Sequence, residues 1–268
     1  MTAWMAGVML LAAAAGTPRG ATAAAPRALT PDGQGVLVFI GDSLTVGADA
    51  FGALATNLRR PRTWTAVVLD AKVGRTASQG ASTLASRMTR TRDVTAVVIA
   101  LGTNDMISQR AASYPPAVIE KVMHESLGVP VLWVTPTFSA SIRPDWRQRA
   151  LRFNRALRAA QQEWPNLYVA DWAGKFVPKG ASRFIADGVH LTVSGYKTRA
   201  SWTVRQVSSF GRTIIDATTT TTTTSSTTSS TTTTTTIPAT TTPPATPPST
   251  TTTPTTSSTT SSTTAPGP

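Results

Sequence analysis

Largely unbroken apolar runs recur along this chain of 268 residues, and they limit its possible folds more than any other feature. The runs lie at residues 36–40, 64–69, 96–101, 129–135 and 167–170. Runs of valine, isoleucine and leucine without apolar–polar alternation are typical of strands that are covered on both faces. Stretches with helical character separate the runs, at residues 50–59, 78–90, 116–127 and 145–164. Alternating strands and helices predict an α/β fold, with a parallel sheet inside a three-layer α/β/α domain.

The amino-terminal segment differs in composition from the part that follows it. Residues 3–15 are apolar and are followed by small residues, with Ala-x-Ala cleavage sites near Ala23 and Ala25, so residues 1–25 are interpreted as a secretory signal peptide. The run is short for a membrane-spanning helix, which needs about 20 residues, and an uncleaved amino-terminal anchor is the alternative. Residues 26–216 are long enough for a single domain with its own core.

The segment 217–268 consists almost entirely of threonine, serine, proline and alanine and carries no charge. It has too little apolar surface to offset the entropy cost of ordering, which predicts a disordered tail rich in threonine, serine and proline. Its composition fits an O-glycosylated stalk or wall-spanning spacer, and equally well an unmodified solubilising tail.

The segment between the two ends is strongly basic. The sequence holds 25 Lys and Arg against 13 Asp and Glu, a net charge of +12, and no charged residue lies beyond Asp216. Outside a cell, such a charge fits retention near anionic cell-wall polymers or lipid head groups better than nucleic-acid binding, although a solvated arginine-rich surface explains it at least as well. The sequence has no cysteine, which excludes a disulfide framework and a thiol nucleophile.

Polar residues and glycines follow four of the apolar runs. Ser43 follows the first run in "GDSL", Gly74 follows the second in "KVGRT", and Asn104 follows the third in "GTND". Asp187 and His190 lie in "DGVH", beyond the fifth run. Because open parallel sheets bind ligands at the carboxyl ends of their strands, these residues are expected at one edge of the sheet.

A catalytic triad is the first chemistry that this set of residues can provide. A serine hydroxyl is a poor nucleophile unless a base takes its proton, and the usual base is a histidine that a carboxylate orients. Of the two histidines, His124 lies inside an expected helix, whereas His190 lies three residues after Asp187. One short loop could therefore supply both the carboxylate and the base for Ser43.

Acyl transfer also needs donors that face the oxyanion of the tetrahedral intermediate. Gly74 can offer a backbone N–H without a side chain in the way, and Asn104 can offer its side-chain amide. Ser43 would add its own N–H at the start of the following helix. All parts of an acyl-transfer site are thus predicted at the same sheet edge.

Other interpretations of single residues are structural. Ser43 could be no more than a helix N-cap, and Asp42 is expected to be structural. The arginines of the helix at 145–164 are expected on a solvated face rather than on a polymer-binding surface, and Trp133, Trp146 and Trp172 in the core or at the rim of the site. Two separated histidines without cysteine predict no metal site, and no cofactor is expected. Nothing indicates the carboxylate pair of a glycosidase.

The four blocks "GDSL", the glycine block at Gly74, "GTND" and "DGVH" resemble, in order, those of the SGNH or GDSL hydrolases. This resemblance implies a flavodoxin-like sandwich with a five-stranded parallel sheet, formed by a catalytic domain at residues 26–216. It implies that Ser43 is the nucleophile, His190 the general base and acid, and Asp187 its orienting partner. It also implies an oxyanion hole made by Ser43, Gly74 and Asn104.

A narrower likeness suggests the setting. The phrases "DAKVGRTASQG", "VVIALGTND", "VADW" and "DGVHLTVSGY" are similar to the extracytoplasmic SGNH domains of peptidoglycan O-acetyltransferases. The sequence lacks the multi-helix membrane half of those proteins, which favours hydrolysis over transfer. We therefore expect a secreted or envelope-associated monomeric serine esterase that acts on acylated glycans or lipids and binds no nucleic acid. The alternatives are an O-acyltransferase with the same triad, a non-catalytic wall-binding module, and a peptidase-like or thioesterase variant.

Overall fold

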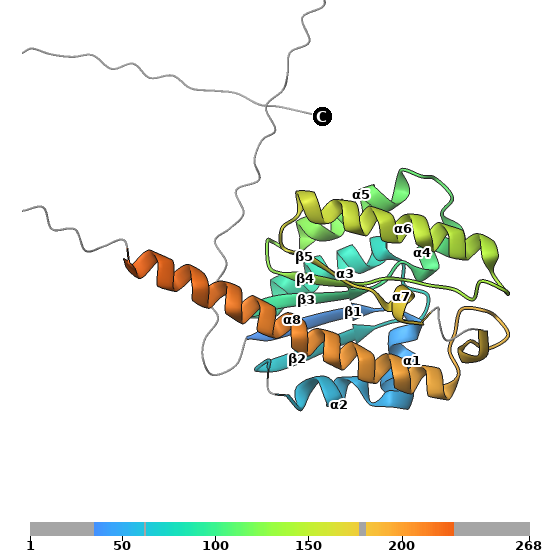
Figure 1. Cartoon of the computed structure of the whole chain (residues 1–268), viewed down its shortest axis with the longest axis horizontal. Helices are drawn as coiled ribbons and strands as arrows, with labels where there is room; N and C mark the ends of the chain where they lie inside the picture. The colour runs from blue at the N-terminus through green and yellow to red at the C-terminus, as the bar shows by residue number, and fades with distance from the viewer. Residues whose placement is uncertain (1–34, 62, 177–180, 228–268) are drawn as a thin grey trace, which may run out of the picture. The chain divides into compact units, whose positions relative to one another are not determined.

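A computed structural model describes residues 35–61, 63–176 and 181–227, so the predicted signal peptide and most of the predicted tail lie outside the described residues. The described chain forms one sheet of five parallel strands in the order β2-β1-β3-β4-β5 (Figure 1). The strands are β1 (Val36–Gly41), β2 (Ala66–Ala71), β3 (Val94–Ala100), β4 (Val131–Val134) and β5 (Leu167–Ala170). The predicted α/β fold with five parallel strands is therefore confirmed.

Helices cover both faces of the sheet (Figure 1). One layer contains α1 (Ser43–Gly52), α2 (Leu54–Arg59) and α8 (Val193–Thr227), and the other contains α3 (Ala77–Arg90), α5 (Tyr114–Glu125) and α6 (Pro144–Glu163). Shorter elements follow β3 and β5: α4 (Thr103–Ser108), α7 (Trp172–Phe176) and a 3₁₀ helix at Ala181–Arg183. This arrangement is the predicted three-layer sandwich.

The central strands contribute to two cores. In β1, Leu37 and Phe39 are buried in the core with α1, α2 and α8, whereas Val38 and Ile40 are buried in the core with α3, α5 and α6. Successive side chains of a strand point to opposite faces, so a strand that is covered on both sides must be apolar at every position. The unbroken apolar runs have this physical cause.

The first helical region is divided into two helices. A helix was expected to start at Ser43, and helical character was expected at residues 50–59; α1 does start at Ser43, directly after β1, but it ends at Gly52. Ala53 then adopts a left-handed conformation, with φ of 50°, and separates α1 from α2. The start of α1 places Ser43 in the first turn of a helix.

The last helix extends past the expected domain boundary. Helix α8 runs to Thr227, eleven residues beyond Asp216, where the tail was expected to begin. Once a helix exists, each added residue gains one hydrogen bond without a new nucleation cost, so a helix can extend into a sequence of weak propensity. Ile214 is the last buried residue of α8 among those whose side chains are described.

Truncation after Asp216 should therefore leave the core complete. We expect the melting temperature and the turnover of a small ester to equal those of the full chain, because residues 217–268 have no charge and no apolar pattern that could pack. Thermal unfolding and an esterase assay on both forms check this. A large drop in either quantity would mean that the tail packs on the domain.

Candidate active site

The ends of three neighbouring strands bring the predicted residues to one edge of the sheet. In the strand register, Gly41 at the end of β1 lies opposite Ala71 of β2 on one side and Ala100 of β3 on the other. Ser43, Gly74 and Asn104 follow these three strands within a few residues. The parallel topology thus places the segments of all three at the carboxyl edge, as expected.

Asp42 stabilises the turn at Ser43. The Asp42 carboxylate accepts a hydrogen bond from the Leu44 amide at 2.9 Å and caps α1. Asp42 is fully buried, and burial raises its pKa, against the opposing effects of the buried Arg199 of α8 and of that amide. The environment of Asp42 therefore fits the structural role that was expected for it. The side chain of Ser43, in contrast, points to the loop that carries His190.

Ser43, His190 and Asp187 form a continuous line of hydrogen bonds. The Ser43 Oγ lies 3.0 Å from His190 Nε2, and His190 Nδ1 lies 2.6 Å from Asp187 Oδ2. The other carboxylate oxygen, Oδ1, accepts from the amides of Val189 at 2.8 Å and His190 at 2.9 Å. The side chains of Asp187 and His190 are each 38% exposed, so a substrate can reach the imidazole from solvent.

The environment of Asp187 keeps its carboxylate charged. Burial raises its pKa, but hydrogen bonds from His190 and from the two amides outweigh burial, and the pKa is lowered overall. An ionised Asp187 accepts a hydrogen bond from a protonated Nδ1 of His190, which leaves Nε2 as the acceptor for the hydroxyl of Ser43. The arrangement can therefore deprotonate a serine at the moment of attack.

The loop that carries Asp187 is held by the segment before α6. Arg143 Nε donates to the carbonyl oxygen of Asp187 at 2.9 Å, and the Ser139 amide donates to the carbonyl of Gly188 at 2.9 Å. Gly188 has φ of +71°, and a Cβ there would lie 2.9 Å from Ile142, so this position requires glycine. Sequence reasoning missed Arg143, because nothing local connects it with a loop 44 residues away.

The expected oxyanion donors lie on two adjoining loops. Gly74 is exposed and has φ of +77°, and a Cβ built on it meets nothing within 4 Å, so no side chain crowds the loop at this position. Asn104, in the first turn of α4, donates from Nδ2 to the carbonyl of Arg75 at 3.0 Å. This bond uses one of the two Nδ2 hydrogens, and the second remains for a ligand.

A buried carboxylate connects the same two loops. Asp105, next to Asn104, accepts from the Ala77 amide at 3.0 and 2.8 Å and from the hydroxyl of Tyr114. Ala77 is the first residue of α3, so Asp105 holds the start of this helix against α4. Burial raises the pKa of Asp105, while the bonds from Tyr114 and Ala77 oppose the rise.

His124, Trp133 and Trp172 lie outside the line of hydrogen bonds from Ser43 to Asp187. His124 on α5 is exposed, lies 3.7 Å from Glu120, and packs edge-on against Trp164. Trp133 and Trp172 are buried in the core, as expected. Within residues 35–61, 63–176 and 181–227, no group of three or more His, Cys, Asp or Glu could hold a metal ion.

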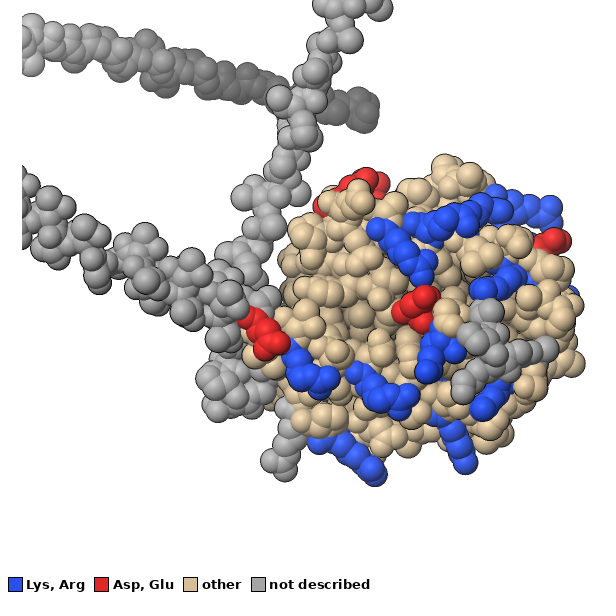
Figure 2. Space-filling model, viewed as in Figure 1, with Lys and Arg blue, Asp and Glu red and all other residues tan. Residues whose placement is uncertain are grey.

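Three arginines of α6 bond other parts of the domain, beyond what was expected of a solvated face. Arg147 donates to Thr137 at 2.7 Å, Arg149 donates to the carbonyl of Ile107 at 2.9 Å, and Arg158 pairs with Asp171 at 3.1 Å. Figure 2 shows lysine and arginine side chains spread over the regions of α6 and α8, with few acidic side chains among them. Several of the expected surface charges therefore also hold loops of the domain.

Comparisons with known proteins bear on the family and the fold of this chain. A family model described as the GDSL-like Lipase/Acylhydrolase family matches residues 39–198. No curated protein matches the chain. Three solved structures illustrate its fold.

The lipase/acylhydrolase from Enterococcus faecalis is 22% identical, with 64% of this chain and 94% of that chain covered and a TM-score of 0.54. The C-terminal catalytic domain of Streptococcus pneumoniae peptidoglycan O-acetyltransferase A, solved with a methylsulfonyl adduct, is 20% identical, with 69% and 95% covered and a TM-score of 0.53. A member of the lipolytic protein G-D-S-L family from Veillonella parvula is 20% identical, with 64% and 97% covered and a TM-score of 0.52. At these identities the likeness establishes the fold.

Proposed function

The chain belongs to the GDSL-like lipase/acylhydrolase family, and from this membership we propose that it is a secreted serine esterase that hydrolyses O-acyl esters through an acyl-enzyme on Ser43. The line of hydrogen bonds from Ser43 through His190 to Asp187, at 3.0 and 2.6 Å, is the observation that carries the proposal. A serine that serves only as a helix cap would need neither a histidine on its hydroxyl nor a carboxylate behind that histidine.

In the first half of the reaction, the Ser43 Oγ attacks the ester carbonyl while His190 Nε2 takes the hydroxyl proton. The carbonyl oxygen becomes negatively charged. Hydrogen bonds donated by the amides of Ser43 and Gly74 and by the side chain of Asn104 would stabilise that charge. The intermediate then collapses, the bond between the carbonyl carbon and the alcohol oxygen breaks, and His190 returns the proton to the alcohol.

In the second half, water takes the place of the alcohol. His190 removes a proton from the water as it attacks the acyl-enzyme, the bond to Ser43 breaks, and Ser43 regains its proton as the free acid leaves. Throughout, the charge on Asp187 stabilises the imidazolium, which is consistent with the lowered pKa of this carboxyl.

Acylated glycans or lipids of the cell envelope are the substrates that we propose. The expected signal peptide supports an extracytoplasmic setting, and the net charge of +12 would favour contact with anionic wall polymers. No helix among the described residues is long and apolar enough to cross a membrane. Hydrolysis of a small chromogenic acetyl ester by the purified protein tests the esterase function. Failure of all short-chain esters in this assay would contradict it.

Acyl transfer to a glycan is the second candidate. It is supported by the likeness to a catalytic domain that is named as a peptidoglycan O-acetyltransferase. Both reactions share the acyl-enzyme and differ only in whether water or a glycan hydroxyl attacks it, so the triad cannot distinguish them.

The product of a competition experiment separates the two candidates. We expect free acetate as the main product when the protein receives an acetyl ester together with millimolar peptidoglycan fragments, because a transferase must exclude water in favour of an alcohol. Chromatography of the released acid and mass spectrometry of the fragments measure the partition. If most of the acetyl group is found on the glycan, the protein is a transferase.

A further inference from the structure

The guanidinium of Arg75 lies buried beneath the loop that carries Gly74. Its Nη1 donates to the carbonyl oxygens of Asp70, at 2.6 Å, and Gly41, at 3.2 Å, and its Nη2 contacts the Asp70 carboxylate at 2.7 Å. The side chain of Arg75 is 7% exposed and that of Asp70 is 16% exposed. A cation that is removed from water must be paired and hydrogen-bonded. The partners of Arg75 are the backbone carbonyls of Gly41 and Asp70 and the carboxylate of Asp70.

These contacts join the three segments that carry the expected oxyanion donors. Gly41 ends β1, two residues before Ser43. Arg75 follows Gly74 in the loop after β2, and its own carbonyl oxygen accepts from Asn104 Nδ2 at 3.0 Å. Arg75 therefore contacts the segment before Ser43 through its side chain and Asn104 through its backbone carbonyl.

We propose that Arg75 is a positioning residue that fixes the distances among the amide of Gly74, the side chain of Asn104 and Ser43. This inference rests on the proposed esterase function. Arg75 acts through the donors and does not touch the substrate. Its planar fork suits the task, because a guanidinium can bond two carbonyls and a carboxylate at once, whereas an ammonium is a single point of charge.

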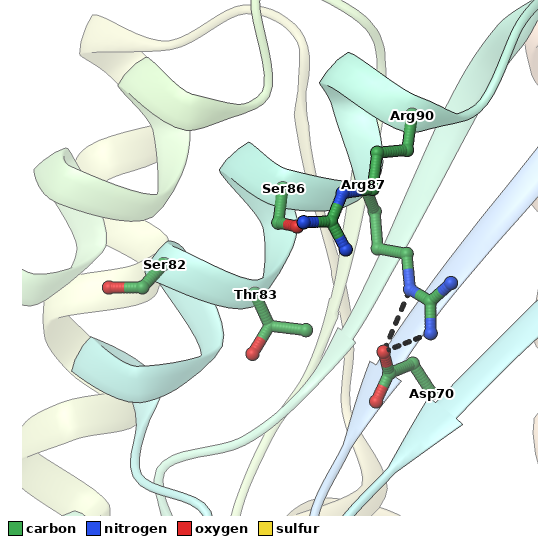
Figure 3. Close-up of a pocket in the computed structure, with 6 residues that line it drawn as sticks. All are labelled: Asp70, Ser82, Thr83, Ser86, Arg87 and Arg90. Atoms are coloured by element: carbon green, nitrogen blue, oxygen red, sulfur yellow. Dashed lines mark hydrogen bonds and ion pairs between the residues drawn. The ribbon is translucent and has the colours of Figure 1, made fainter.

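Arg87 provides a matched control on the same carboxylate. Its Nε and Nη2 lie 2.8 and 2.6 Å from Asp70 Oδ2, and its side chain is 40% exposed. Figure 3 shows Arg87 reaching Asp70 from α3, where both line a polar pocket. The rest of that pocket is formed by Ser82, Thr83, Ser86 and Arg90. The Arg87 side chain bonds the Asp70 carboxylate and not Gly41, Gly74 or Asn104, so its removal weakens the Asp70 pairing without releasing the loop.

The test compares Arg75→Met and Arg75→Lys with Arg87→Met on a chromogenic acetyl ester. We expect kcat to fall roughly tenfold to a hundredfold in both Arg75 variants. A displacement of the catalytic groups by about 1 Å can lower the rate by up to about a hundredfold. KM and the pH profile should remain those of the wild type, since His190 and Asp187 are untouched. Inactivation by a phosphonate ester, whose phosphoryl oxygen occupies the oxyanion hole, should slow by the same factor as kcat/KM. Arg87→Met should match the wild type in all of these.

Two results would overturn the inference. One is that the folded fraction of Arg75→Met has wild-type kcat; the other is that Arg87→Met loses as much turnover as Arg75→Met, which would reduce both residues to general stability. If Arg75→Met does not fold, Arg75→Lys and Asp70→Asn, which weakens the support of the guanidinium, carry the comparison.

Hydrogen exchange distinguishes a failure of this inference from a failure of the proposed function. Amides from Gly74 to Ala77 should exchange faster in Arg75→Met than in the wild type and in Arg87→Met, a readout that needs no substrate. If the wild type hydrolyses no ester while exchange rises as expected, the proposed function is wrong but the holding of the loop by Arg75 stands. Unchanged exchange with unchanged turnover overturns the inference alone.

Discussion

Replacing either Ser43 or His190 with alanine should lower ester turnover by a factor of about 10⁴ or more, with folding intact. Ser43→Ala removes the oxygen that forms the acyl-enzyme, and His190→Ala removes the group that lies 3.0 Å from it and takes its proton. Residues of a triad act as a unit, so the two losses should not add. Turnover by the double variant should be close to that of the slower single variant. Steady-state kinetics with a chromogenic acetyl ester measure the effect.

His124→Ala is the matched control for the histidine variant. This residue is exposed on α5 and contacts Glu120 and Trp164, so its loss should leave turnover nearly unchanged. Circular dichroism of all variants establishes that the fold persists. Wild-type activity in His190→Ala would contradict the assignment of the base.

Asn104→Ala should lower kcat by about a hundredfold to a thousandfold. Removing one donor from an oxyanion hole costs about 3 kcal/mol in the activation barrier, because the donor bonds the transition state more strongly than the ground state. The same substitution also removes the bond from Asn104 to the carbonyl of Arg75, whose net contribution to stability is about 1 kcal/mol. The expected loss of rate is therefore clearly larger than the expected loss of stability.

Denaturant unfolding and kinetics on the same preparation measure the two losses separately. Ser108→Ala is a suitable control, since its hydroxyl bonds the backbone carbonyls of Asn104 and Asp105 and not the side-chain amide of Asn104. If Asn104→Ala loses as much free energy of unfolding as it loses in activation energy, Asn104 is a structural residue and the oxyanion hole must be composed differently.

The sheet could be predicted from the sequence because burial on both faces forces apolar residues at nearly every strand position, as in β1 and, apart from Thr95, in β3. The residues of the site could be selected because chemistry restricts them: a nucleophile, a base and a carboxylate have few alternatives in a chain with two histidines. The local break at Ala53 could not be predicted in detail: Gly52 suggests a helix end, but it is Ala53 that adopts the left-handed conformation, which alanine rarely does.

The support of the site could not be predicted either. Arg75 bonds Gly41 across 34 residues, Arg143 bonds Asp187 across 44, and Asp105 bonds Ala77 across 28. In the sequence, each of these residues is one charged residue among many, and only the folded chain determines its partner. The groups that we propose to react are therefore visible in short motifs, whereas the contacts that hold them in place depend on the tertiary structure.

We propose that an acyl group passes through Ser43, and this claim can be tested by trapping the acyl-enzyme. The full chain is mixed with an excess of a fast acetyl ester, quenched in acid within the first turnover, digested and analysed by mass spectrometry. We expect the acetyl group on the peptide that contains Ser43, and no modification of this peptide in Ser43→Ala. An acetyl group on another residue, or turnover of the ester by Ser43→Ala at the wild-type rate, would contradict the claim.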